Sequence, residues 1–279
     1  AAMAAITPKY SANTENMKKS QIREILKLTQ RPDIISFGGG LPAPETFPVE
    51  ELRAASERVF AKHAAKALQY GTTEGDIALR EALLRYEASH GVKAKPGNLL
   101  ITSASQQALD MLPKLFLDPG DWVIAGRPTY IGAIQAIQSY RGKILGIPFG
   151  PEKDGFDMVE LERRYAEAKA GGARIKYIYV IPDFQNPTGI CWSLEKRKAL
   201  LEFSYREGLI LVEDSPYREI RFMGESVPSI YQLDSEGAAQ GNVINLKTFS
   251  KILAPGTRIG WLLARPDIID KFVTAKQAM

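Results

Sequence analysis

The fold is decided by residues 176–189, which read KYIYVIPDFQNPTG. The first part of this stretch, from Tyr177 to Ile181, is apolar or aromatic at every position, so a strand formed here needs a cover on both faces. The second part is rich in proline, glycine and polar side chains, which end a strand and turn the chain. The stretch therefore predicts a buried strand in a sheet between two layers of helices, with a polar turn at its carboxyl end.

Short apolar segments alternate with helical patterns on both sides of this stretch. Seven strands are predicted, at 99–102, 122–125, 143–147, 176–181, 209–213, 242–246 and 259–264. Apolar residues at helical spacing predict helices at 106–116, 130–140, 158–170 and 194–207, and upstream at 14–30, 49–67 and 74–90. This alternation predicts an α/β fold, a three-layer α/β/α large domain with a mostly parallel seven-stranded sheet.

The composition argues against several classes of protein. Of 279 residues, 45% are hydrophobic and 24% are charged, as in an ordinary globular protein. The 36 basic and 32 acidic residues are mixed along the chain and give a net charge of +4, so neither a nucleic acid nor a membrane is expected as a partner. No apolar run reaches the ~18 residues that span a bilayer, and the start lacks the features of a signal peptide. A cytoplasmic protein is expected.

Cysteine and histidine are too scarce to carry the chemistry. Cys191 is the only cysteine, and His63 and His90 are the only histidines. An internal disulfide, a metal site and a Ser-His-Asp triad are therefore not expected.

The polar residues at the strand ends point to function, because ligands of such sheets bind beyond the carboxyl ends of the strands. Ser103 and Ser105 follow the first strand, either as plain helix caps or as part of an anion site at a helix start. Tyr130 follows the second strand, either as a core aromatic or as a ring that stacks on a flat ligand. Asn186 follows the fourth strand, either as a turn residue or as an amide that faces a ligand.

A carboxylate and a lysine complete the set. Asp214 follows the mostly apolar fifth strand, and a partly buried carboxylate needs a cationic partner. Lys251 follows the sixth strand after Thr248 and Ser250, and a lysine desolvated in a pocket becomes a nucleophile. Each residue alone has an ordinary structural explanation. Together with Arg258, the set fits a flat, phosphorylated pyridine aldehyde, which is pyridoxal 5′-phosphate.

The order of these motifs resembles that of the class I/II aminotransferases, which are pyridoxal-phosphate enzymes of fold type I. The matching segments are Gln69-Tyr70-Gly71, Ser105-Gln106, Pro128-Thr129-Tyr130, Asn186-Pro187-Thr188-Gly189, Asp214-Ser215-Pro216-Tyr217, Thr248-Phe249-Ser250-Lys251 and Arg258. The loop FGGGLP at 37–42 is most similar to the branch that contains 2-aminoadipate and kynurenine aminotransferases. The resemblance spans nearly the whole chain.

The resemblance implies catalytic roles for the residues around the pyridine ring. Lys251 would bind the cofactor covalently and then carry the proton between the substrate Cα and the cofactor. Asp214 would pair with the ring nitrogen. Asn186 and Tyr217 would hydrogen-bond the phenolic oxygen of the ring, and Tyr130 would stack on its face.

The resemblance also implies which residues bind the phosphate and the substrate. The phosphate would be held by Ser105, Gln106, Thr248, Ser250 and Arg258. Tyr70 would reach the phosphate of the neighbouring subunit, so that a homodimer with shared active sites is expected. Gly39, Gly40 and Asn186 would lie near the substrate.

On this resemblance, residues 1–48 form an N-terminal segment and part of a small domain, and residues 49–279 form the large cofactor-binding domain. The resemblance also implies that these 279 residues lack the C-terminal small domain of the family and the arginine in it that binds the substrate α-carboxylate. Two explanations stay open. The chain is either a truncated form of an ordinary enzyme or a short natural form that binds the cofactor but handles amino acids poorly.

The implied function is transfer of the amino group of an L-amino acid, of the 2-aminoadipate, aromatic or branched-chain type, to a 2-oxo acid such as 2-oxoglutarate. A lyase or decarboxylase on the same scaffold is an alternative, because the bond that breaks depends on how the substrate is oriented. A further alternative is a non-catalytic module, such as the sensory domain of a transcription regulator. No winged-helix segment precedes Met17, which counts against the regulator.

Overall fold

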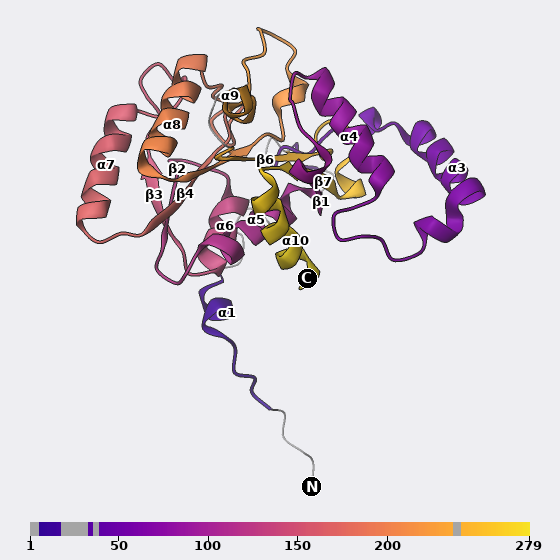
Figure 1. The fold of residues 1–279 in the computed structure, drawn as a ribbon, viewed down its shortest axis with the longest axis horizontal. Coiled ribbons are helices and arrows are strands. Elements are labelled where there is room, and N and C mark those ends of the chain that lie inside the picture. Colours follow the sequence, from indigo (N-terminus) through magenta and orange to yellow (C-terminus); the bar gives the residue numbers. More distant parts are fainter. Residues whose placement is uncertain (1–5, 18–32, 36–38, 237–240) are drawn as a thin grey trace.

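A seven-stranded sheet forms the centre of the molecule (Figure 1). The computed structural model describes residues 6–17, 33–35, 39–236 and 241–279. The strands are β1 (Leu99–Ser103), β2 (Trp122–Gly126), β3 (Lys143–Ile147), β4 (Ile175–Val180), β5 (Ile210–Asp214), β6 (Val243–Thr248) and β7 (Ile259–Leu263). Their spatial order is β1-β7-β6-β5-β4-β2-β3, and only β7 runs antiparallel to its neighbours. The predicted mostly parallel sheet is confirmed.

Helices cover both faces of this sheet (Figure 1). One face packs against α5 (Ala104–Phe116), α6 (Ile131–Ser139) and α10 (Pro266–Gln277). The other face packs against α4 (Ile77–Ser89), α7 (Met158–Ala170), α8 (Leu194–Glu207) and α9 (Ile230–Glu236). The predicted three-layer α/β/α arrangement is confirmed.

Strand β4 shows why the apolar run requires two helical layers. Its side chains alternate between the two faces of the sheet, as in any strand. Tyr177 and Tyr179 belong to the core under α5 and α6. Ile178 and Val180 belong to the core under α7 and α8, and all four residues are at most 2% exposed. Each face therefore has its own hydrophobic core.

Local capping sets several helix bounds. Helix α4 begins at Ile77, later than the predicted start at 74, because the Asp76 side chain accepts a hydrogen bond from the Leu79 N–H and caps the helix there. Helix α8 has the predicted bounds: Ser193 caps its start, and Gly208, with a φ of 66°, ends it. In α5, by contrast, Ser103 occupies the cap position but its side chain makes no capping hydrogen bond.

Some elements differ from the sequence-based expectation. Helices α9 and α10 were not predicted, although Pro266 at the first turn of α10 is a typical start signal. Of the helix predicted over 14–30, the structure describes α1 (Ala12–Asn16), and residues 18–30 lie outside the described residues. No helix in the described ranges is both long enough and apolar enough to cross a membrane.

Helix α3 (Val49–Ala67) has the predicted bounds but buries none of its residues within this chain. It lies at the edge of the molecule, beyond α4 (Figure 1). Val59 and Phe60 on this helix are 40% and 58% exposed. Apolar side chains on an uncovered helix are typical of a surface that another part of an assembly covers.

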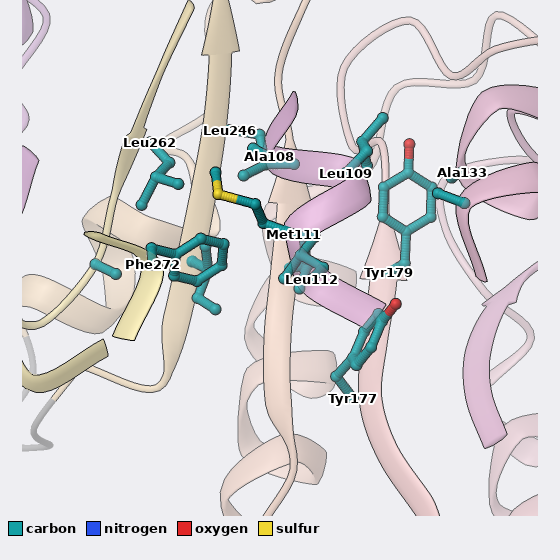
Figure 2. Close-up of a cluster of buried hydrophobic side chains, with 14 of the residues drawn as sticks. Ala108, Leu109, Met111, Leu112, Ala133, Tyr177, Tyr179, Leu246, Leu262 and Phe272 are labelled. Atoms are coloured by element: carbon teal, nitrogen blue, oxygen red, sulfur yellow. The ribbon is translucent and has the colours of Figure 1, made fainter. Parts of the chain in front are cut away.

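The core between α5, α10 and the sheet is closely packed. Figure 2 shows Met111 extending from α5 toward Leu246, Leu262 and Phe272, and all four side chains are fully buried. Close packing of this kind tolerates little loss of volume, because the cavity left behind closes only in part.

Replacing Phe272 by alanine should therefore lower the free energy of unfolding by about 3–5 kcal/mol. The matched control is Val159→Ala on α7, since Val159 is 77% exposed and its truncation should change stability by less than ~1 kcal/mol. Urea unfolding followed by circular dichroism measures both changes. Equal losses in the two variants would contradict the described core.

Candidate active site

A cavity of about 290 Å³ opens at the carboxyl ends of the parallel strands. The sequence-predicted residues that line it are Gly39, Ser105, Gln106, Tyr130, Asn186, Asp214, Tyr217, Thr248, Ser250, Lys251 and Arg258. Ala104, Ile181, Pro216 and Pro255 also line it. These four were not predicted, because nonpolar residues beside a strand end give no chemical signal.

The sheet topology explains why residues so distant in sequence meet here. Strands β1, β2, β4, β5 and β6 run in the same direction, so their carboxyl ends share one edge. Strand β7 runs the other way, so its start lies at this edge and brings Arg258 to it. A cavity at this place is typical of open α/β sheets.

Asp214, at the end of β5, is the buried charge of the cavity. Its side chain is 2% exposed, and its Oδ2 accepts a hydrogen bond of 2.7 Å from the Tyr179 hydroxyl. Its Oδ1 is buried without a hydrogen-bond partner among the described residues. Burial raises the pKa of Asp214 to about 7, against the lowering effect of the Tyr179 hydrogen bond. The open oxygen therefore needs a donor or a cation from a bound molecule.

Tyr179 was not predicted as a site residue. It lies within β4, and sequence patterning assigned it to the hydrophobic core. Its ring is indeed in that core, while its hydroxyl reaches Asp214 on the neighbouring strand. Only the pairing of β4 with β5 reveals this contact.

Lys251 projects into the cavity from the turn after β6. Its Nζ donates a hydrogen bond of 3.1 Å to the Gly40 carbonyl and lies 5.9 Å from the centre of the Tyr217 ring. Burial lowers the pKa of Lys251. A lower pKa leaves a larger share of the amine uncharged, which is the nucleophilic form.

Asn186 and Tyr217 form one wall of the cavity. The Asn186 Nδ2 donates a hydrogen bond of 3.1 Å to the Tyr217 hydroxyl oxygen. The Tyr217 hydroxyl hydrogen is then left for an acceptor in the cavity. Burial raises the pKa of Tyr217, so the hydroxyl stays protonated and able to donate at neutral pH.

The other end of the cavity is lined by the start of α5 and by Arg258. Ala104 and Arg258 both have a left-handed backbone, with φ values of 52° and 51°, and the Ala104 N–H donates to the Arg258 carbonyl at 3.0 Å. Strand β7 comes this close because residue 260 is glycine: a Cβ there would lie 2.6 Å from the Ala104 carbonyl carbon. This geometry places the start of α5 at the cavity, where the helix dipole and free N–H groups favour an anion.

Hydroxyls and a guanidinium face the same end. The hydroxyls of Thr248 and Ser250 lie 2.9 Å apart in a shared hydrogen bond. Arg258 is exposed and makes no ion pair with any residue that the structure describes. The arrangement of α5, two hydroxyls and an arginine suits a phosphate group.

Two predicted residues do not line the cavity. Gly40 contributes only its carbonyl to Lys251. Tyr70 is 98% exposed and makes no contribution to the cavity of its own chain. Among the described residues, no cluster of histidine, cysteine and acidic side chains that could hold a metal ion occurs.

Comparisons with known proteins place this geometry among related chains. The family model described as aminotransferase class I and II matches residues 32–279. Aromatic-amino-acid aminotransferase 1 of Thermococcus litoralis is 45% identical over 97% of this chain and 64% of its own length. The chain thus spans a little under two thirds of that curated relative.

Solved structures agree with this match. Kynurenine aminotransferase of Pyrococcus horikoshii is 44% identical, with a TM-score of 0.88 over 96% of this chain and 65% of its own. The alpha-aminoadipate aminotransferase of Thermus thermophilus, solved with N-(5′-phosphopyridoxyl)-L-leucine, is 40% identical, with a TM-score of 0.85 over 96% of this chain and 64% of its own.

The raised pKa of Asp214 predicts a pH-dependent difference between the cofactor-free protein and its Asp214→Asn variant. Between the ordinary aspartate pKa, near 4, and about 7, the folded wild type holds a proton that the unfolded chain has lost. Its stability therefore falls as the pH rises through this window, whereas asparagine cannot ionise. The wild type should lose roughly 2–3 kcal/mol relative to the variant between pH 5 and pH 8.

Urea unfolding of both proteins at several pH values measures this difference. Both forms keep the hydrogen bond from Tyr179, since asparagine retains an acceptor oxygen. A stability difference that stays constant from pH 5 to pH 8 would show that the Asp214 carboxyl is not desolvated as described.

Proposed function

The chain belongs to the class I and II aminotransferases, and we propose that it moves the amino group of an L-amino acid to a 2-oxo acid such as 2-oxoglutarate, with pyridoxal 5′-phosphate as cofactor. The observation that carries the proposal is the open Oδ1 of Asp214, a buried carboxylate oxygen in the same cavity as Lys251. A molecule that offers it a charged N–H and offers Lys251 an aldehyde meets both requirements.

The described residues fit this cofactor from end to end. The Asp214 Oδ1 suits the protonated nitrogen of a pyridine ring. The start of α5, together with Thr248, Ser250 and Arg258, suits the phosphate. Tyr130 lines the same cavity and suits a stacking role. Asn186 and Tyr217 suit the phenolic oxygen.

When bound, pyridoxal phosphate supplies a conjugated system that accepts the electrons released at the substrate Cα. Asp214 contributes the negative charge that keeps the ring nitrogen protonated. Lys251, with its lowered pKa, would carry the proton from the substrate Cα to the cofactor. Tyr217 donates its hydroxyl hydrogen and stabilises negative charge on the phenolic oxygen. Preorganised groups of this kind are worth several kcal/mol of transition-state stabilisation.

The substrate class comes from the relatives. Their names cover aromatic amino acids, kynurenine and alpha-aminoadipate, and one structure holds a phosphopyridoxyl adduct of leucine. We propose the same range of donors: 2-aminoadipate, aromatic and branched-chain amino acids. Gly39, Gly40 and Asn186 would lie beside the substrate, because Gly39 and Asn186 line the cavity and the Gly40 carbonyl contacts Lys251.

The proposed active form is a cytoplasmic homodimer with shared active sites. Helix α3 buries none of its own residues, and Tyr70 follows it at 98% exposure, near Leu68 at 75%. A second subunit would cover these apolar side chains and receive Tyr70 at its phosphate. In this proposal residues 1–48 belong with a small domain, and residues 49–279 form the large domain.

The test of the proposed function is borohydride labelling of the purified chain after incubation with pyridoxal phosphate. A visible absorption band that borohydride abolishes, with the label on Lys251, is expected. Addition of L-glutamate before borohydride should convert the band to that of the amine form of the cofactor. Lys251→Ala should show neither change, and Lys271→Ala, which removes an exposed lysine of α10, should behave as the wild type.

Absence of the band in the wild type would overturn the proposal of a pyridoxal-phosphate enzyme. A band that glutamate leaves unchanged, together with loss of carbon dioxide from an amino acid, would instead favour a decarboxylase on the same scaffold.

The shared active site predicts complementation between two inactive variants. Tyr70→Ala and Lys251→Ala should each lose most activity. The first removes a phosphate contact in the neighbouring subunit, and the second removes the lysine that binds the cofactor in its own subunit. In a mixed dimer, the chain that retains Lys251 would receive Tyr70 from its partner, which forms one complete site. Activity should therefore reappear after the two variants are unfolded together and refolded. If the mixture stays as inactive as its parts, Tyr70 does not act across a subunit interface.

A further inference from the structure

A second buried carboxylate, Asp183, lies three residues before Asn186 and outside the cavity lining. It is fully buried, and three arginines surround it. Arg197 donates to both carboxylate oxygens, at 2.8 and 3.2 Å. Arg218 donates to Oδ2 at 3.0 Å, and Arg221 donates to Oδ1 at 3.2 Å. Every acceptor position of the carboxylate is thus used by a guanidinium.

The three arginines come from two different parts of the chain. Arg197 lies in α8 and is fully buried; it also donates to the carbonyls of Pro182 and Trp192. Arg218 directly follows Tyr217, and Arg221 lies three residues further on. Asp183 therefore ties the segment that carries Asn186 to the segment that carries Tyr217.

The backbone next to Asp183 needs this support. Phe184 has a φ of 51°, a left-handed conformation that costs a non-glycine residue on the order of 1–2 kcal/mol. Such conformations persist only where surrounding contacts hold them. The Arg221 guanidinium lies 4.8 Å from the centre of the Phe184 ring, so the same arginine that binds Asp183 also covers the residue with the unfavourable backbone.

The charge of Asp183 is maintained despite its burial. Burial alone would raise the pKa of Asp183, but the arginines, Arg197 foremost, hold it below its usual value. Apolar residues can fill such a site with equal stability, whereas charged groups fix geometry by their directional hydrogen bonds. We call the cluster of Asp183, Arg197, Arg218 and Arg221 the arginine clamp. Its charges are better explained by a need to place the two connected segments precisely than by a gain in stability.

We propose that Asp183 is a positioning residue: through the arginine clamp it holds Asn186 and Tyr217 at the spacing at which both hydrogen-bond the phenolic oxygen of the bound cofactor. The two side chains meet at 3.1 Å between the clamped segments. This inference rests on the proposed function, because the phenolic oxygen belongs to pyridoxal phosphate.

The test variants are Arg218→Gln and Arg221→Gln, which each remove one tie and leave the fully buried pair of Asp183 and Arg197 intact. The matched control is Arg174→Gln. Arg174 lies before β4 and binds another fully buried carboxylate, that of Asp121, which the Lys176 ammonium also contacts at 3.4 Å. Test and control each remove one arginine from a fully buried carboxylate that keeps a second cationic partner; the Arg174 side chain is 64% exposed, against 10% for Arg218 and 14% for Arg221.

The readout is the pH midpoint at which the visible band of the lysine-bound cofactor changes. Hydrogen bonds to the phenolic oxygen favour its anionic form and lower this midpoint. Looser placement of Tyr217 should raise it by about 0.5–1 pH unit, which corresponds to one ordinary hydrogen bond. Arg174→Gln should leave it unchanged. Other titratable groups near the pair, Asp214, Lys251 and Tyr130, are the same in all variants.

Two further measurements distinguish a direct effect of the lost arginine charge from an effect of misplaced Tyr217. If Arg218→Gln acts through Tyr217, it should shift the pH midpoint hardly at all in a protein that already carries Tyr217→Phe. A direct effect of the lost charge would give the same shift with or without Tyr217. Asp183→Asn should raise the midpoint by misplacing Asn186 and Tyr217. Loss of a negative charge by itself would lower it. If Asp183→Asn does not fold, because Arg197 is left unpaired, the double-mutant cycle decides alone.

Unchanged midpoints in Arg218→Gln and Arg221→Gln, or full additivity with Tyr217→Phe, would overturn the positioning role while the wild-type band still supports the proposed function. A wild type without a band at Lys251 would instead refute the proposed function itself. The two failures are thus distinguishable in one set of spectra.

Discussion

The site depends on one half-satisfied carboxylate. Asp214 is buried at the end of β5 and, among the residues that the structure describes, receives a single hydrogen bond, from Tyr179 on β4. This burial raises the pKa of Asp214 to about 7. A carboxyl group in this state gains most from a partner that brings its own positive charge. The other residues that line the cavity surround the space that this positively charged partner would fill.

The two buried aspartates illustrate opposite uses of the same side chain. Asp183 has all its acceptor positions filled by arginines and stays charged. Asp214 has a neutral tyrosine on one oxygen and nothing described on the other. A saturated carboxylate fixes its neighbours, whereas an open one binds a ligand. Asp214 is the last residue of β5, and Asp183 lies just beyond the end of the adjacent strand β4. Asp183 and its arginines therefore support the wall of the cavity that Asp214 lines.

The fold was largely predictable because its strands are apolar on both faces, as in residues 177–181, and this pattern has few other interpretations. Helix α10 was not predicted, although Pro266 at its first turn is a typical start signal. Most polar residues of the cavity were also predictable, because parallel strand ends converge regardless of loop detail, whereas the nonpolar lining residues were not. Tyr179 and the arginine clamp were not, because their roles arise from contacts across strands and helices. The individual roles in binding and catalysis stay predictions.

In the proposed function, Asp214 provides a buried negative partner for the protonated nitrogen of a pyridine ring. The most direct measurement is the 15N NMR shift of ring-labelled pyridoxal phosphate bound to the wild type and to Asp214→Asn at pH 8. The ring nitrogen should be protonated in the wild type and unprotonated in the variant. An unprotonated nitrogen in the wild type, or no difference between the two proteins, would rule out this role of Asp214.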